Sequence, residues 1–129
     1  MHTPAKILCI DDEPVPLKLR CEVLKNAGYD VVVAGSGKEG IRRFSAQHFD
    51  LVVLDYWMAD INGLDVAEEL KRINPPIPIL MLSGYRSILD EAVGKIDRWL
   101  LKGETEPEDL LSAISELLSR GQNSQTASP

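Results

Sequence analysis

The chain has 129 residues, and its 14 Lys and Arg residues against 20 Asp and Glu residues give a formal net charge of −6. This length suits one domain with an aliphatic core, and we expect no room for a second folded output domain. The acidic balance argues against direct binding to nucleic acid or to an anionic membrane, because such surfaces need clustered Lys and Arg.

Two further features limit where the protein acts. The chain lacks an apolar run of about 18 residues that could span a membrane, and its polar start lacks the apolar segment of a signal peptide. We therefore expect a cytoplasmic protein. Cys9 and Cys21 are too few for a disulfide framework and have no Cys or His neighbours at zinc-site spacing, so both are predicted to be small buried residues.

Five short apolar runs alternate along the chain with longer amphipathic segments. The runs predict strands that are covered on both faces, at residues 6–10, 29–34, 50–54, 78–82 and 98–101. Five helices are predicted: from Pro14 to Gly28, from Ser36 onward, from Gly63 to Asn74, within residues 88–96, and from Pro107 to Gly121. The fourth of these is predicted to be short. This alternation predicts an α/β fold, a doubly wound parallel sheet of five strands with five helices.

The last eight residues differ from the rest of the chain. They are polar and without periodicity, which is typical of disorder. We therefore predict a domain at residues 1–121 and a disordered tail at 122–129.

Chemically reactive side chains follow four of the predicted strands. They are Asp11, Asp12 and Glu13 after the first strand, Asp55 after the third, Ser83 at the end of the fourth and Lys102 at the end of the fifth. Apart from Asp55, each of these residues taken alone could be an ordinary cap, turn or strand-end residue. Because ligands of such folds bind beyond the carboxyl ends of the strands, we expect these groups to meet at one edge.

Clustered carboxylates repel one another unless a hard divalent cation lies among them, and Mg²⁺ is the natural occupant. With a Lys and a Ser nearby, such a site could stabilise a phosphoryl group. One carboxylate would then be the nucleophile that forms an acyl phosphate. Asp55 follows four apolar residues, where an ionised group needs a partner.

Four segments resemble the receiver domains of two-component response regulators. They are ILCIDDEP at 7–14, LVVLDYWMADINGLD at 51–65, ILMLSG at 79–84 and WLLKG at 99–103. The resemblance covers about residues 5–119. It implies a flavodoxin-like strand order, 2-1-3-4-5, and a regulatory phospho-acceptor rather than an enzyme.

The resemblance also implies roles for the site residues. Asp55 would accept a phosphoryl group from the phosphohistidine of a histidine kinase or a phosphotransferase. Mg²⁺ would be held by Asp12 and Asp55 directly, by Asp11 through water and by the main-chain carbonyl of Trp57. Phosphorylation would then switch the domain so that it regulates a downstream effector protein.

Further roles concern the response to phosphorylation. By resemblance, Lys102 would pair with the phosphoryl group, the Ser83 hydroxyl would turn toward it, and Trp99 would be the aromatic switch residue. Trp57 and Tyr85 flank the acceptor, where large rings could exclude water and slow hydrolysis. They could equally be rings packed on the surface.

The sequence departs from the family pattern at three places. Ala59 replaces a usual proline, which should slightly reduce loop rigidity. Gly103 replaces the proline that usually follows the lysine, so a cis bond is not expected and the loop should take another path. The spacing from Ser83 to Lys102 is short, which indicates a short or displaced fourth helix. In this family the fourth helix, fifth strand and fifth helix commonly form the output face, so the change suggests a partner or homodimer mode of its own. A neutral deletion in a surface helix would explain it equally well.

Two other hypotheses about function stay open at this stage, and the second covers two activities. The chain could be a phosphorylation-independent interaction module on a receiver scaffold, although it keeps every acidic residue of the site. It could also be a flavodoxin-like cofactor protein or a phosphatase. Asp11, Asp12 and Glu13 would repel a flavin phosphate, and Trp57 stands where a dehalogenase-type phosphatase would have a second Asp.

Overall fold

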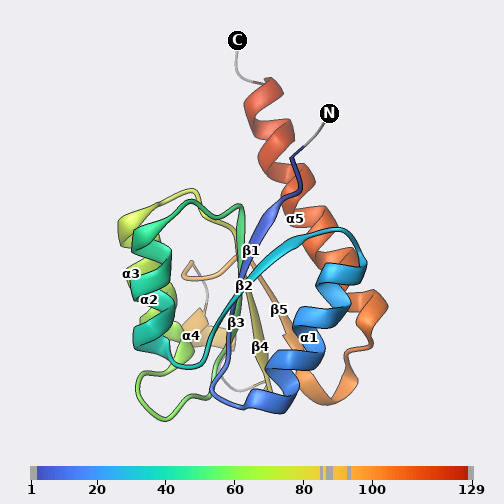
Figure 1. Cartoon of the computed structure of the whole chain (residues 1–129). Helices are drawn as coiled ribbons and strands as arrows, with labels where there is room; N and C mark the ends of the chain where they lie inside the picture. Colours follow the sequence, from blue (N-terminus) through green and yellow to red (C-terminus); the bar gives the residue numbers. More distant parts are fainter. Residues whose placement is uncertain (1–2, 85, 87–88, 93, 128–129) are drawn as a thin grey trace.

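The computed structural model describes residues 3–84, 86, 89–92 and 94–127. Five parallel strands form one sheet in the order β2-β1-β3-β4-β5, with helices on both faces (Figure 1). The strands are β1 (Lys6–Ile10), β2 (Asp30–Ala34), β3 (Leu51–Asp55), β4 (Ile79–Ser83) and β5 (Arg98–Leu101). The predicted doubly wound fold and its strand order are confirmed.

The helices divide into two layers. Helices α1 and α5 cover one face of the sheet, and α2, α3 and α4 cover the other (Figure 1). Their bounds are Pro14–Asn26 for α1, Gly37–Ala46 for α2, Gly63–Ile73 for α3, Leu89–Ala92 for α4 and Pro107–Ala127 for α5. A short 3₁₀ turn, η2 (Lys102–Glu104), follows β5.

Strand alternation builds a separate apolar core under each layer. In β1, Leu8 and Ile10 pack in the cluster under α2 and α3, whereas Ile7 and Cys9 pack in the cluster under α1 and α5. All four side chains are fully buried, because successive side chains of a strand point to opposite faces. The centre of the sheet is therefore apolar up to the carboxyl ends of its strands.

Side-chain caps fix where two of the helices begin. Ser36 Oγ accepts a hydrogen bond from the Glu39 N–H at 3.1 Å, and the Glu39 carboxylate accepts one from the Gly35 N–H. At the start of α3, Asn62 Oδ1 accepts from the Asp65 N–H at 3.0 Å. Each cap satisfies a backbone N–H that has no partner within its helix. The starts predicted for these helices are confirmed.

Two sequence predictions need correction. The fifth helix does not end at Gly121, because α5 continues to Ala127. The domain boundary after residue 121 and the disordered tail stay predictions. A glycine inside a helix costs only about 1 kcal/mol, and no proline interrupts this segment before Pro129. Cys9 is buried as predicted, but Cys21 is only half-buried on α1.

The fourth helix is short, as its sequence spacing predicted. It has four residues, Leu89–Ala92, and the chain then turns at Gly94, whose φ of 81° is in the left-handed region that favours glycine. The apolar positions Ile88 and Val93 of the predicted helix lie outside the described residues.

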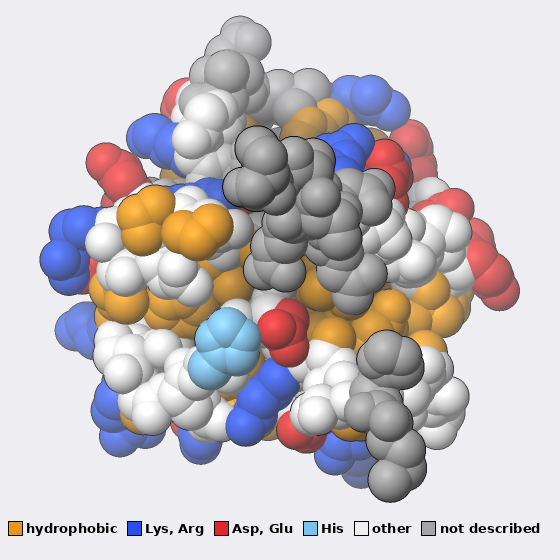
Figure 2. Space-filling view, turned by 90° about the horizontal axis from the view of Figure 1, so that it is seen from above, with side chains coloured by type: hydrophobic (Ala, Val, Ile, Leu, Met, Phe, Trp, Pro, Cys, Tyr) orange, Lys and Arg blue, Asp and Glu red, His pale blue; other side chains and the backbone are white. Residues whose placement is uncertain are grey.

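The end of the molecule where the strands begin is shown in Figure 2. Lys, Arg, Asp and Glu side chains are distributed around its rim.

Among the helices described, none is long and apolar enough to cross a membrane.

Candidate functional site

Three carboxylates meet at the carboxyl end of the sheet. Strands β1 and β3 are neighbours, and Ile10 of β1 pairs with Leu54 of β3. Asp11 follows Ile10 and Asp55 follows Leu54, and the two therefore lie beside each other. One carboxylate oxygen each from Asp11, Asp12 and Asp55 lies within 4.8 Å of the others. The structure therefore brings together the carboxylates that the sequence placed at separate strand ends.

Asp55 is buried and has one close cationic neighbour. It is the last residue of β3 and is 1% exposed, and no backbone N–H or hydroxyl group of the described residues donates a hydrogen bond to its carboxylate. The Lys102 ammonium lies 3.0 Å from Asp55 Oδ1. Burial raises the pKa of Asp55 to about 6, against the lowering influence of Lys102, and the nearby Asp11 charge adds to the rise.

Asp11, in contrast, is fully engaged. Its Oδ1 accepts a hydrogen bond from the Glu13 N–H at 2.9 Å, and its Oδ2 accepts one from Arg20 Nη1 at 3.1 Å. Lys102 Nζ lies 4.0 Å from the same Oδ2. The sequence did not indicate Arg20, because an arginine on an amphipathic helix is usually solvated, whereas this side chain is only 11% exposed.

Asp12 is held by the loop that follows β3. Its Oδ2 accepts a hydrogen bond from the Ala59 N–H at 2.8 Å. A proline has no N–H and could not make this bond. The replacement of the family's usual proline therefore has a consequence that we did not predict: the loop is tied to a carboxylate of the site.

The same loop is anchored to α2 and packed closely against β3. The Asp60 carboxylate accepts hydrogen bonds from the Gly37 and Lys38 N–H groups at 3.0 and 2.9 Å. The Gly63 N–H donates to the Tyr56 carbonyl at 2.7 Å. A Cβ on Gly63 would come within 2.6 Å of the Asp55 carbonyl oxygen, so only glycine fits there. These contacts fix the backbone that carries Asp55.

The remaining predicted site residues have different surroundings. Ser83 is the last residue of β4 and is 1% exposed, one position beyond Leu82, which pairs with Asp55. Trp99 is half-buried and packs against the apolar cluster under α2, α3 and α4. Trp57 is 69% exposed, and Tyr85 lies outside the described residues.

The loop after Lys102 differs from a proline-containing loop. The peptide bond between Lys102 and Gly103 is trans, and η2 begins at Lys102. The Thr105 hydroxyl donates to the Leu101 carbonyl at 2.6 Å, which closes this turn.

The donor set suits a hard divalent cation. Carboxylate oxygens are the ligands that Mg²⁺ prefers. The two buried Asp55 oxygens have Lys102 as an ion-pair partner but no backbone N–H or hydroxyl donor among the described residues. Two cations, Arg20 and Lys102, face three carboxylates, so one negative charge remains at the site. The residues present therefore fit Mg²⁺.

A family model and curated relatives both match most of this chain. The family model for the response regulator receiver domain matches residues 7–115. The transcriptional regulatory protein GlrR of Escherichia coli K12 is 35% identical over 122 residues, which are 92% of this chain and 27% of that protein. The probable transcriptional regulator ycf27 of Cyanophora paradoxa is 35% identical over 121 residues, 92% of this chain and 50% of that protein. The chain thus spans about a quarter to a half of these two relatives.

Solved structures show the same fold. A CheY-like receiver domain protein from Methanospirillum hungatei JF-1 superposes with a TM-score of 0.89 at 26% identity, covering 95% of this chain and 99% of that one. The response regulator protein TrrA from Thermotoga maritima, solved in complex with Mg²⁺-BeF, superposes with a TM-score of 0.82 at 31% identity, covering 88% of this chain and 98% of that one. The chain therefore belongs to the family of receiver domains of two-component response regulators.

Proposed function

We propose that Asp55 accepts a phosphoryl group from a histidine kinase or phosphotransferase in a Mg²⁺-dependent reaction, and that the phosphorylated domain regulates a partner protein. The observation that carries this proposal is the Asp55 carboxylate. Both of its oxygens are buried, no backbone N–H or hydroxyl group of the described residues donates to them, and Lys102 forms an ion pair with one of them at 3.0 Å. A carboxylate left in this state can form a bond to phosphorus.

The reaction transfers one group between two nucleophiles. An Asp55 oxygen forms the new O–P bond while the P–N bond of the donor phosphohistidine breaks, and the electron pair of that bond stays on the imidazole. Bound Mg²⁺ would supply positive charge to the phosphoryl oxygens. Lys102 would pair with another of these oxygens. Because the pKa of Asp55 is about 6, the carboxylate is mostly ionised at pH 7 and above.

The hydrogen bonds of each carboxylate support the proposed roles in metal binding. Asp11 already accepts two hydrogen bonds, which supports a role through water rather than direct coordination. Asp12, Asp55 and the main-chain carbonyl of Trp57 are the proposed direct ligands. The complex of TrrA with Mg²⁺-BeF supports this choice of metal.

The response would pass through the end of β4 and through β5. Ser83 is buried at the end of β4, and Trp99 lies in β5 with its side chain half-buried on the apolar cluster. We propose that Ser83 turns toward the phosphoryl group and that Trp99 repacks. The face of α4, β5 and α5 would then bind an effector or a second copy of the chain.

The names of the relatives support the assignment to signalling. They include transcriptional regulatory proteins and the autoinducer 1 sensor kinase/phosphatase LuxN of Vibrio harveyi. We propose that this domain works in the cytoplasm and, given its net charge of −6, influences DNA only through other proteins or domains.

The proposal is tested by incubating the protein with Mg²⁺ and acetyl phosphate and measuring its intact mass. We expect one phosphoryl adduct on the wild type, little without Mg²⁺, and none on Asp55→Asn. Asp50→Asn is the matched control, because Asp50 lies at the opposite end of β3. Absence of any adduct on folded wild-type protein would favour the phosphorylation-independent interaction module.

Trp57 provides a prediction about the lifetime of the phosphorylated state. Its ring follows the acceptor by two residues, and we expect it to hinder the approach of water to the acyl phosphate. Trp57→Ala should lose the phosphoryl group several-fold faster, as measured by the decay of the adduct mass after excess donor is removed. An unchanged decay rate would mean that the ring, which is 69% exposed, only covers the surface.

A further inference from the structure

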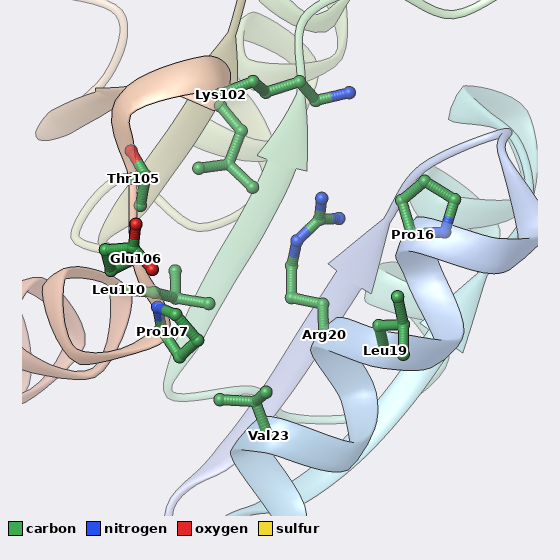
Figure 3. Close-up of a pocket in the computed structure, with 10 residues that line it drawn as sticks. Pro16, Leu19, Arg20, Val23, Lys102, Thr105, Glu106, Pro107 and Leu110 are labelled. Carbon is green, nitrogen blue, oxygen red and sulfur yellow. The ribbon is translucent and has the colours of Figure 1, made fainter.

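Arg20 is a cation that belongs to the acidic site although it comes from a helix. It lies in α1, nine residues after Asp11, and its side chain is 11% exposed. Figure 3 shows it projecting from α1 into a groove whose top is crossed by the Lys102 side chain. The groove has a volume of about 250 Å³, and Leu19, Val23 and Leu110 form part of its apolar wall. A charge in such surroundings is less screened than one in water.

Arg20 and Lys102 share one oxygen atom. Arg20 Nη1 is 3.1 Å from Asp11 Oδ2, and Lys102 Nζ is 4.0 Å from it. Lys102 also lies 3.0 Å from Asp55, so it bridges two carboxylates, whereas the described ion pairing of Arg20 is to Asp11. The charge that a metal would neutralise at Asp11 is thus already balanced within the protein.

We propose that Arg20 is a built-in counter-cation of the acceptor site that weakens its affinity for Mg²⁺. This rests on the proposed function, in which Asp12 and Asp55 bind the ion directly and Asp11 binds it through water. A guanidinium paired with Asp11 offsets one of the negative charges that attract Mg²⁺. Its own positive charge also repels the incoming ion. In exchange, Arg20 keeps the buried Asp11 carboxylate paired when no metal is bound.

A purely structural role for Arg20 makes the opposite prediction. If Arg20 only oriented Asp11, removing it would disorder a carboxylate of the site and Mg²⁺ would bind more weakly. If its charge opposes the ion, removing it makes Mg²⁺ bind more tightly. The sign of the change in affinity therefore separates the two roles.

The experiment is a titration of the purified protein with MgCl₂, followed by calorimetry or by Trp fluorescence, since Trp57 follows Asp55 by two residues. We expect Arg20→Met to bind Mg²⁺ about ten-fold more tightly than the wild type, equivalent to about 1.4 kcal/mol. Arg20→Lys, which keeps the charge, should stay close to the wild type. Arg42→Met is the matched control, because Arg42 is an exposed arginine of α2.

Arg20→Gln provides a second neutral variant whose amide can still donate to Asp11, and it carries the test if Arg20→Met does not fold. Tighter binding by Arg20→Gln supports the counter-cation role. Unchanged or weaker Mg²⁺ binding by folded neutral variants overturns it, even if the wild type still forms the phosphoryl adduct. If instead the wild type forms no adduct while the neutral variants bind Mg²⁺ more tightly, the proposed function fails and the role of Arg20 stands.

Discussion

Asp55→Asn should stabilise the folded protein at neutral pH. The wild-type pKa of this residue is raised from 3.8 to about 6, chiefly by burial, so folding makes its ionised form less favourable. A rise of this size corresponds to about 2–3 kcal/mol at pH 7. Asparagine has a similar shape and no charge, so the variant should gain free energy of unfolding of this order.

The gain should depend on pH in a defined way. A carboxyl group with a raised pKa binds its proton more tightly in the folded state than in the unfolded state. The group therefore does not lower the free energy of unfolding below about pH 4, and it lowers it increasingly as the pH rises to about 6. Urea unfolding at a series of pH values should therefore show a difference between variant and wild type that appears between pH 4 and 6 and is constant above. A difference that is equally large at pH 3, or is absent at pH 7, would show that the burial of Asp55 does not cost folding energy.

Gly63→Ala should strongly destabilise the protein. The added Cβ would lie 2.6 Å from the Asp55 carbonyl oxygen and 2.7 Å from the Tyr56 Cα. Both are backbone atoms, so β3 or the start of α3 must move. Overpacking of this kind costs roughly 3 kcal/mol, and the displaced backbone is the one that carries the acceptor.

Gly103→Ala is the matched control for this prediction, because nothing lies within 4 Å of the Cβ position there. We expect its free energy of unfolding to stay within about 0.5 kcal/mol of the wild type. Thermal and urea unfolding measure both variants. Equal stability of the two would mean that the loop after β3 adapts easily and does not fix Asp55.

The sequence predicted most of the fold because its signals are local. Each strand was placed within one residue, since apolar runs such as residues 50–54 mark strands that are covered on both faces. The convergence of Asp11, Asp12 and Asp55 also followed, because parallel strands end at one edge of a sheet. The end of α5 was misplaced, because Gly121 disfavours but does not stop a helix.

The contacts that the sequence missed depend on packing. The burial of Arg20 follows from how α1 lies on the sheet, where Leu17 and Leu24 hold it, and no local pattern encodes that. At residue 59 the sequence shows only that an alanine in place of proline has an N–H group able to donate, which in the structure binds Asp12. That partner could not be named before the fold placed Asp12 across the sheet edge.

The central claim is that Asp55, among the clustered carboxylates, is the one that forms the acyl phosphate. Treating the phosphorylated protein with borohydride reduces an acyl phosphate to the alcohol, which turns the modified aspartate into homoserine. Peptide mass mapping should find homoserine at position 55 and unmodified aspartate at positions 11 and 12. Homoserine at position 11 or 12, with Asp55 intact, would contradict the account.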